Sequence, residues 1–332
     1  MSARVVLGFS GGVDSAVAAS LLLEQGCDVR CLYLETGSGE EPSARAGAEA
    51  LGLPLRVYDA RAELERYVCA PFAEGCAQGR TPSPCVLCNP DVKLRLLLEY
   101  AQELGAEHIA TGHYARAEGG ALYMGREGCD QSYMLCRILP RQLERLLLPL
   151  GGYVKGEVRA LAAARGLPSA SKSDSMELCF VPDGDFAAWI ERRGEAPPPG
   201  ELIYNGRAVG LHRGIHRYTL GQRRGLGFAA GRRVYVSAID PAANTVTLSE
   251  GAGLYSREVR APDARWLAPR PRGPFRCLAR IRHSRSAAGA LCLPEGDGVS
   301  LLFDEPQRAP TPGQAAAVYS PEGRLLCGGI IA

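Results

Sequence analysis

The sequence predicts an α/β fold with a doubly wound parallel sheet, followed by a small mixed or all-β middle domain and a C-terminal antiparallel β-barrel. In the first half of the chain, short apolar runs alternate with amphipathic helical patterns, as in a parallel sheet covered by helices. Beyond about Gly184 the pattern changes to strand-like pieces separated by Pro and Gly turns. A chain of 332 residues also exceeds the usual size of one hydrophobic core. We therefore expect three domains, at residues 1–184, 185–250 and 251–332.

The expected elements follow in chain order. Apolar, β-branched runs predict parallel strands at Val5–Phe9, Val29–Leu34, Leu55–Tyr58 and His108–Thr111. Helical periodicity predicts helices at Ala16–Gln25, Ser43–Leu51, Val92–Leu104, Val154–Arg165 and Phe186–Arg193. The last region should contain strands at Arg276–Arg282, Gly298–Phe303 and Gln314–Tyr319. Ligands of such a parallel sheet bind at the carboxyl ends of its strands.

Composition restricts the class of protein. No apolar stretch approaches the roughly 18 to 20 residues that cross a bilayer, and no basic segment with an apolar signal core opens the chain. We therefore expect a cytoplasmic protein without a membrane partner. The formal net charge is only +2, and Lys93, Lys155 and Lys172 are the only lysines. Arginine suits phosphates and bases, which leaves nucleic-acid contact open, but an arginine-rich genome would explain the same bias.

A Gly/Ser-rich loop, GFSGGVDS, directly follows the first apolar run and directly precedes an apolar helix. Free backbone N–H groups and a helix N-terminus then point at one place, which favours an anion such as pyrophosphate. The Walker A loop carries a lysine, and no lysine stands near this loop in the sequence, so γ-phosphoryl transfer is not the natural interpretation. The predicted nucleotide-binding residues are Gly8, Phe9, Ser10, Gly11, Gly12, Val13, Asp14 and Ser15.

Twelve cysteines in a cytosolic chain indicate metal, redox or nucleophilic chemistry for a few and packing for the rest. Cys85 and Cys88 form a C-x-x-C pair after a Pro-stiffened loop and just ahead of the helix that carries Lys93, where a helix N-terminus lowers a thiol pKa. Cys179 lies in the polar segment 171–180. The C-x-x-C pair alone is also compatible with a zinc half-site or a redox pair. Apolar neighbours predict core positions for Cys27, Cys31, Cys277, Cys292 and Cys327.

Taken together, these segments resemble a known family. The SGGVDS loop, both cysteine segments, and the motifs at residues 110–116, 130–133, 218–227 and 311–314 closely resemble the bacterial tRNA-specific 2-thiouridylases, which are N-type ATP pyrophosphatases. The resemblance runs nearly end to end. It implies an adenine nucleotide alpha hydrolase-like fold and ATP-dependent conversion of the wobble uridine of tRNA to 2-thiouridine. Transfer of AMP to the uracil C2 oxygen would make that oxygen a leaving group.

The resemblance also implies roles for particular residues. Cys179 would carry a persulfide delivered by a sulfur-relay donor protein, and Cys88 would resolve the reaction through a disulfide with it. ATP would bind with Mg²⁺, for which Asp14 is a candidate ligand as well as a candidate helix cap. Leu34, where the family commonly has methionine, and Gly112 would flank the adenine and ribose. Ser83, Pro84 and Cys85 would line the flipped target base. Further tRNA contacts would come from His113, Cys129, Asp130, Gln131, Arg282, His283 and Gln314.

Two points in this resemblance stay open. Arg282-His283 stands where the family often has Arg-Tyr, so the base or backbone contact of this pair departs from the family pattern. A set of arginines in the middle region could contact tRNA phosphates, or could simply be exposed to solvent. They are Arg213, Arg217, Arg223 and Arg224.

Cys85 departs from the family, because many members carry an aspartate there, a candidate general base or thiol orienter. With Cys88 and Cys179 it makes three thiols, which could hold a [4Fe–4S] cluster with an open iron. A simple thiol variant of the persulfide route is the favoured interpretation. Other function classes remain: an amide-forming ligase, which needs no paired thiols; a non-catalytic RNA-binding or sulfur-carrier module, against which the intact loop argues; and a paralogue that thiolates another substrate.

Overall fold

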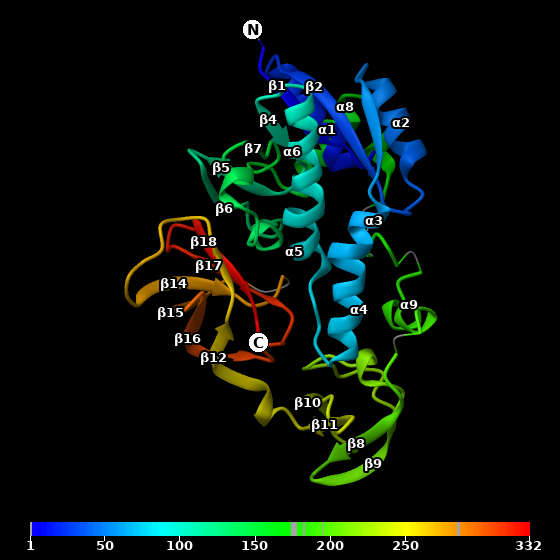
Figure 1. Cartoon of the computed structure of the whole chain (residues 1–332), viewed down its shortest axis with the longest axis vertical. Coiled ribbons are helices and arrows are strands. Elements are labelled where there is room, and N and C mark those ends of the chain that lie inside the picture. The colour runs from blue at the N-terminus through cyan, green and yellow to red at the C-terminus, as the bar shows by residue number, and fades with distance from the viewer. Residues whose placement is uncertain (1, 174–177, 182, 195, 284–285) are drawn as a thin grey trace.

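The computed structural model describes residues 2–173, 178–181, 183–194, 196–283 and 286–332. Residues 174–177 of the cysteine-bearing segment 171–180 therefore lie outside the described residues. In Figure 1 the parallel sheet and its helices form the upper part of the molecule, a small mixed sheet lies at the bottom, and the C-terminal sheet lies at the left. Among the described residues, no helix combines the length and apolarity of a membrane span.

A five-stranded parallel sheet organises the N-terminal part. Its strands run in the order β3-β2-β1-β4-β7, and every neighbouring pair is parallel. The order reverses at β1, so the crevice that binds ligands in doubly wound folds opens beside the end of β1. The predicted fold class is confirmed. Strand β7 was not predicted, because it has only two residues and so shows no periodicity. The strands are β1 (Arg4–Gly8), β2 (Asp28–Glu35), β3 (Leu55–Asp59), β4 (His108–Ala110) and β7 (Leu146–Leu147).

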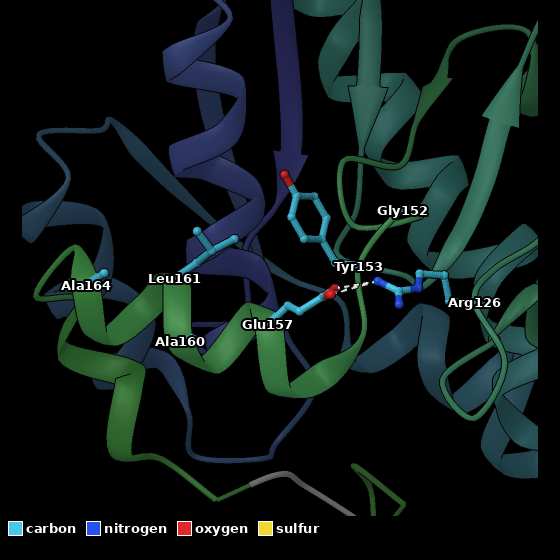
Figure 2. Close-up of a pocket in the computed structure, with 7 residues that line it drawn as sticks. All are labelled: Arg126, Gly152, Tyr153, Glu157, Ala160, Leu161 and Ala164. Carbon is cyan, nitrogen blue, oxygen red and sulfur yellow. Dashed lines mark hydrogen bonds and ion pairs between the residues drawn. The ribbon is translucent and has the colours of Figure 1, made fainter.

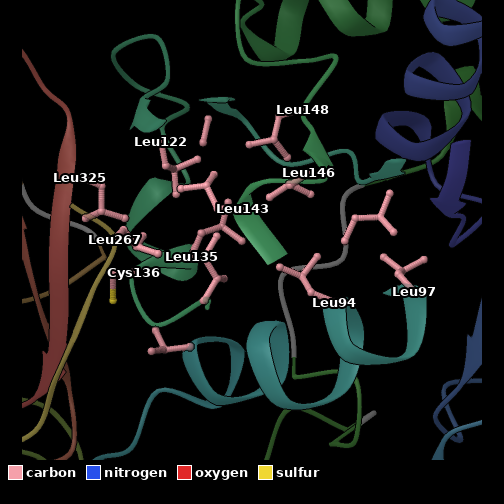
Figure 3. Close-up of a cluster of buried hydrophobic side chains, with 14 of the residues drawn as sticks. Leu94, Leu97, Leu122, Leu135, Cys136, Leu143, Leu146, Leu148, Leu267 and Leu325 are labelled. Carbon is pink, nitrogen blue, oxygen red and sulfur yellow. The ribbon is translucent and has the colours of Figure 1, made fainter. Parts of the chain in front are cut away.

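Helices cover both faces of this sheet because alternate strand residues point to opposite sides. Val5 and Leu7 pack with α1 (Val13–Glu24), α2 (Glu41–Ala50) and α8 (Lys155–Ala164). Val6 packs on the other face with α6 (Leu94–Glu103). That second core continues through Leu135, Cys136 and Leu267 to Leu325 of the C-terminal sheet (Figure 3). One continuous core thus joins the two parts.

Two long helical segments run down the centre of the molecule (Figure 1). The first, residues 61–77, consists of α3 (Arg61–Leu64), a π-helical turn (Glu65–Cys69) and α4 (Ala70–Ala77). It was not predicted because Pro71 interrupts its pattern. The second consists of α5 (Pro84–Cys88), a π-helical turn (Asn89–Lys93) and α6. The helix expected at Val92–Leu104 therefore begins eight residues earlier, at Pro84, because Pro90 is accommodated within the π-helical turn.

Smaller elements complete the chain before residue 250. A hairpin of β5 (Ala115–Glu118) and β6 (Ala121–Met124) follows β4, and α7 (Pro140–Leu143) precedes β7. After α9 (Phe186–Arg192), a four-stranded sheet has the order β10-β11-β8-β9 and is mixed, because β11 and β8 run parallel. Its strands are β8 (Gly200–Tyr204), β9 (Arg207–His212), β10 (Tyr235–Asp240) and β11 (Thr245–Ser249).

The C-terminal part is a curled antiparallel sheet of seven strands in the order β12-β16-β15-β14-β17-β18-β13. Only two residues separate β12 from β13, the two edge strands, so the edges are held close together and the sheet curls like a barrel. The strands are β12 (Tyr255–Ala261), β13 (Ala264–Trp266), β14 (Phe275–Arg280), β15 (Ala288–Glu295), β16 (Gly298–Arg308), β17 (Ala315–Tyr319) and β18 (Leu325–Ile330).

Four of the five cysteines expected in cores are buried, and the fifth, Cys27, is only half-buried because it lies in the exposed turn after α1. Cys31 belongs to the core under β2. The C-terminal core contains the other three buried members of the set, Cys277, Cys292 and Cys327.

Candidate active site

The loop between β1 and α1 makes a tight turn at the helix N-terminus. Gly11 has a φ of +73°, and a Cβ there would lie 2.5 Å from the carbonyl carbon of Ser43 and 2.7 Å from Cα of Ala44. Gly12 is the N-cap in extended conformation. The Ser15 hydroxyl donates to the Gly12 carbonyl at 3.0 Å and lies 3.3 Å from the Ser10 hydroxyl. The first N–H groups of α1 have no intrahelical partner, so the turn presents donors suited to an anion.

Two residues of the predicted nucleotide set contribute through their backbone. The side chain of Phe9 is buried, and its ring packs against Gly47 of α2. Val13 is also buried in the core beneath the loop. Their side chains shape the loop from behind, while its backbone faces the crevice.

Asp14 does not cap α1, because Gly12 is the N-cap and Asp14 lies in the first helical turn. The helix-cap interpretation is therefore wrong. The Nζ of Lys155, the first residue of α8, lies 2.8 Å from each carboxylate oxygen of Asp14. The Tyr114 hydroxyl donates to Oδ1 at 2.6 Å. As arranged, Asp14 does not fit a magnesium ligand, since a metal ion there would meet the Lys155 ammonium.

Lys155 is the residue beside the loop that the loop motif could not reveal. It lies 141 residues beyond Asp14 in sequence, and the fold brings it to the loop because α8 packs beside α1 on the same face of the sheet. The rarity of lysine in this chain was the one available signal.

The carboxyl ends of β2 and β4 flank this loop. Leu34 lies at the end of β2 and is half-buried. A Cβ on Gly112, just beyond β4, would lie 3.0 Å from the Asp14 carbonyl carbon, so glycine lets β4 approach the first turn of α1. His113 Nδ1 lies 2.7 Å from the Thr111 hydroxyl. Burial and the nearby Lys93 ammonium hold the pKa of His113 well below its usual range, so the ring is neutral at pH 7.

Cys88 ends α5 and is half-buried. Burial raises the pKa of its thiol to about 12, and the charge of Lys93 opposes that rise only in part. The expected lowering by a helix N-terminus is therefore wrong for Cys88. The reason is structural: α5, the π-helical turn and α6 continue one another, so Cys88 lies a full turn inside the helical segment. Cys85 lies in the first turn of that segment and is exposed.

Cys179 lies close enough to these two thiols to interact with them electrostatically. Its thiol hydrogen-bonds the side chain of Thr36, the residue that follows β2. Although the residue is exposed, protein atoms surround the thiol, and this desolvation followed by the charge of Cys85 raises its pKa. A further thiol, buried Cys69, interacts electrostatically with both Cys179 and Cys88. No sequence motif marks Cys69, which lies between Val68 and Ala70.

The donor chemistry of Cys85, Cys88 and Cys179 suits an iron-sulfur cluster, which takes cysteine thiolates. Within the described part of the chain, however, no three or more His, Cys, Asp or Glu side chains are grouped so that they could hold a metal ion. As they stand, the three thiols do not form a cluster site.

A hollow of about 190 Å³ lies between the first and middle parts of the chain, and none of Cys85, Cys88 and Cys179 lines it. Pro84 and Leu178, the neighbours of Cys85 and Cys179, contribute to its wall. Three aromatic residues, Phe72, Phe186 and Tyr218, line it as well. Such walls suit a nucleobase, which stacks on aromatic faces.

A second hollow, of about 480 Å³, lies beside α8 (Figure 2). Glu157 and Arg126 form an ion pair across it at 2.8 Å, and Tyr153 and Leu161 complete much of its wall. No residue of the Gly8–Ser15 loop lines it, so it is separate from the predicted nucleotide site.

Gln314 holds the loop that leads into α5. Its Nε2 donates to the Thr81 carbonyl at 2.7 Å, and the Thr81 N–H donates to the Pro312 carbonyl at 2.8 Å. Gly313 has a φ of +91°, and a Cβ there would lie 2.9 Å from the Pro82 nitrogen. The C-terminal sheet thereby fixes the segment that carries Ser83, Pro84 and Cys85.

Replacing Gln314 by alanine should loosen this segment. We expect a stability loss of about 1 kcal/mol for the missing hydrogen bond and a roughly tenfold fall in kcat, because misplaced thiols react slowly. Thermal unfolding and single-turnover assays measure the two effects. Gln307→Ala is the control, since Gln307 is half-buried on β16 and donates to the nearby Glu305 carbonyl; an equal kcat loss in this variant would contradict the positioning role.

The segment 129–131 joins parts of the protein. The Asp130 carboxylate accepts hydrogen bonds from the Gly125 N–H at 2.7 Å and the Ser132 hydroxyl at 2.9 Å, and it pairs with Arg280 of β14. Gln131 accepts the Tyr114 N–H through its side chain at 3.1 Å. The neighbouring Cys129 Sγ accepts the Lys155 N–H at 3.4 Å.

Of the remaining predicted tRNA residues, Arg282 donates to the Leu220 and Ala309 carbonyls at 2.9 and 3.0 Å and so joins the middle and C-terminal sheets. His283 is exposed, and the centre of its ring lies 6.2 Å from the centre of the Tyr133 ring. Among the middle arginines, Arg217 forms two hydrogen bonds of 2.7 Å with Glu191. The other three, Arg213, Arg223 and Arg224, are exposed.

Comparison with known proteins decides the family. A tRNA-specific 2-thiouridylase from Syntrophotalea carbinolica is 42% identical over 347 aligned residues, which cover 99% of this chain and 98% of the relative. The chain belongs to the tRNA-specific 2-thiouridylase family. A 2-thiouridylase from Chloroflexus aurantiacus is 41% identical and covers 99% of this chain and 98% of its own.

Three domain families match successive parts of this 2-thiouridylase family member. They are the tRNA methyl transferase HUP domain at residues 3–183, the tRNA methyl transferase PRC-barrel domain at residues 191–250, and the aminomethyltransferase beta-barrel domain at residues 256–331.

Proposed function

We propose that this protein is an ATP-dependent tRNA-uridine 2-sulfurtransferase that converts the wobble uridine of tRNA to 2-thiouridine. The observation that carries the proposal is the meeting of an anion-binding loop with paired thiols at one edge of the sheet. The Cys179 thiol hydrogen-bonds the side chain of Thr36, which follows β2. Strand β2 pairs with β1, and β1 leads directly into the loop. The relatives named tRNA-specific 2-thiouridylase match over nearly their whole length. We assign the protein to the cytoplasm, where its tRNA substrate occurs.

In the first step the uracil C2 oxygen attacks the α-phosphorus of ATP. An O–P bond forms, the bond from the α-phosphorus to the bridging oxygen breaks, and pyrophosphate leaves with that electron pair. The N–H groups of the Gly8–Ser15 loop hold the phosphates, and Leu34 and Gly112 flank the adenosine. Magnesium entering with ATP would neutralise phosphate charge, but Asp14 is not proposed as its ligand.

In the second step sulfur replaces the activated oxygen. The terminal sulfur of a persulfide on Cys179 attacks C2, and AMP leaves with the former C2 oxygen. The Cys88 thiolate then attacks the Cys179 sulfur, so the S–S bond to the new sulfur breaks and the thiocarbonyl is released. The resulting Cys88–Cys179 disulfide is reduced by an external dithiol. Since the resting thiols carry raised pKa values, Lys93 has to favour the Cys88 thiolate when substrate is bound.

The persulfide sulfur comes from a sulfur-relay donor protein, and tRNA is held by all three parts of the chain. We assign ATP binding, chemistry and part of the tRNA contact to residues 1–184, and the rest of the tRNA contact to residues 185–250 and 251–332. The target base enters the hollow beside Pro84, where Ser83 and Cys85 are its neighbours. Exposed Arg223 and Arg224 contact tRNA phosphates. The remaining predicted tRNA contacts belong to the surfaces around His113, Cys129, Asp130, Gln131, Arg282, His283 and Gln314.

Removing the Asp14 carboxylate should abolish adenylation and spare tRNA binding. We expect Asp14→Ala to lower tRNA-dependent ATP–pyrophosphate exchange by roughly 10²-fold or more, because the carboxylate organises the phosphate end of the site. Electrophoretic tRNA binding should be nearly unchanged. Asp28→Ala is the control, since Asp28 begins β2 at the opposite edge of the sheet and pairs with Arg4. Equal loss of exchange and tRNA binding in Asp14→Ala would contradict the assigned role.

A second candidate is a cluster-dependent form of the same thiolation, for which Cys85 supplies a third thiol, although the three thiols are not grouped as a metal site in the described part of the chain. Anaerobic reconstitution with iron and sulfide, followed by metal analysis, distinguishes the cluster-dependent form from the persulfide route. The persulfide route predicts iron far below the roughly four atoms per chain of a [4Fe–4S] cluster, and thiolation that survives chelation. Stoichiometric iron, with activity lost in the chelated protein, would establish the cluster form instead.

A further inference from the structure

A lysine from a distant part of the chain lies beside the phosphate loop. Lys155 opens α8, and its Nζ contacts both oxygens of Asp14 at 2.8 Å. The same ammonium lies 5.8 Å from the centre of the Tyr114 ring, whose hydroxyl donates to Asp14 at 2.6 Å. The pair is partly open to solvent, with side-chain exposures of 26% for Lys155 and 31% for Asp14. A ligand can therefore reach it.

The charges at this point are arranged for an anion. Asp14 lies in the first turn of α1, and Lys155 is the first residue of α8, so two helix N-termini lie close together. A lysine at a helix N-terminus has the wrong sign for the helix dipole. In the free protein Asp14 compensates that charge. Pyrophosphate carries more negative charge than one carboxylate, so its arrival would place Lys155 between two attractive partners.

We infer that Lys155 is a further catalytic residue, whose ammonium contacts the β- and γ-phosphates of ATP and stabilises the departing pyrophosphate. Asp14 and Tyr114 are positioning residues that hold this ammonium. The inference rests on the proposed function and adds to it the source of the positive charge. Lys155 keeps its proton throughout: the bond from the α-phosphorus to the bridging oxygen breaks, pyrophosphate takes the electron pair, and the ammonium neutralises the charge that develops.

This role explains why the loop itself has no lysine. A Walker A loop carries its phosphate-binding lysine within the loop. Here the equivalent charge comes from the start of another helix, held in place by a carboxylate inside the loop. Asp14 thereby serves the nucleotide through Lys155 and not as a metal ligand.

The competing explanation is that Lys155 and Asp14 form only a structural ion pair between α8 and α1. The chain offers a matched control for this possibility. Arg165, which follows the last residue of α8, pairs with Glu24, the last residue of α1, at 2.6 Å. This pair ties the same two helices at their other ends, far from the loop.

The test compares Lys155→Met, Lys155→Arg and Arg165→Met by tRNA-dependent ATP–pyrophosphate exchange. We expect Lys155→Met to lower kcat by roughly 10²- to 10³-fold with a smaller change in the KM for ATP, since the contact strengthens as the leaving group forms. Lys155→Arg should recover part of the loss, and Arg165→Met should stay within about twofold of the native rate. A Lys155→Met rate within about threefold of native, or an equal loss in Arg165→Met, would overturn the inference.

A second measurement does not depend on tRNA chemistry. Calorimetric titration with inorganic pyrophosphate at fixed Mg²⁺ should show about tenfold weaker binding to Lys155→Met than to the native protein or Arg165→Met. Equal affinities would overturn the inference whatever the tRNA assay gives. If the native protein failed to thiolate tRNA but still bound pyrophosphate in a Lys155-dependent way, the proposed function would be refuted and the pyrophosphate contact of Lys155 would stand.

Discussion

Replacing Cys179 by serine is expected to abolish tRNA thiolation, with a loss of at least roughly 10³-fold, because a hydroxyl cannot carry a persulfide sulfur. Adenylation should survive, since the phosphate loop lies on a different element and its geometry does not involve this thiol. Mass spectrometry of the tRNA measures thiolation, and ATP–pyrophosphate exchange measures adenylation. The same variant also separates thiolation from amide formation, which needs no such thiol.

Cys27→Ser provides the matched control for this prediction. Cys27 is half-buried in the turn after α1, so the change removes one thiol without touching the cleft. It should thiolate tRNA at nearly the native rate. Persistence of thiolation in Cys179→Ser would show that the sulfur travels by another route, and loss in both variants would point to a general effect of thiol removal.

A methyl group on Gly11 is expected to destroy ATP-dependent activity. Gly11 has a φ of +73°, which alanine tolerates poorly, and its new Cβ would lie 2.5 Å from the Ser43 carbonyl carbon. Backbone cannot yield as a flexible side chain can, so the loop and α2 must move apart. We expect a stability loss of about 1–3 kcal/mol and exchange activity reduced by roughly 10²-fold or more, because the donors no longer converge.

The neighbouring glycine supplies the control. Gly12 is extended, and a Cβ there would meet the Ser10 hydroxyl at an ordinary 3.4 Å. The free energy of unfolding of Gly12→Ala should lie within about 1 kcal/mol of that of the native protein, as expected for an N-cap change. Thermal unfolding of the two variants side by side measures the difference. Equal melting temperatures would show that the close packing of Gly11 on α2 is not a constraint.

The sequence predicted the sheet well because its strands are short apolar runs that the two-sided burial of a parallel sheet requires. Val5 and Val6 are both buried although they face opposite layers. The helical segment at residues 61–77 could not be predicted, because Pro71 and a π-helical turn break the periodicity on which such predictions depend.

The same distinction between local and long-range information applies to the residues of the candidate site. The loop and the C-x-x-C pair were visible because their residues are local in sequence. Lys155 was not, because a 141-residue separation carries no local pattern. The thiol pKa of Cys88 was predicted in the wrong direction, since only the fold reveals that Cys88 lies inside a continuous helical segment and is desolvated there.

The most direct test of wobble-uridine thiolation is mass spectrometry of tRNA nucleosides from cells that lack this protein. We predict that 2-thiouridine and its derivatives disappear from the wobble position and return with the native gene, but not with the Cys179→Ser gene. Loss of a different thionucleoside would identify a paralogue with another substrate. Persistence of wobble 2-thiouridine, with no other thionucleoside changed, would contradict the proposed function.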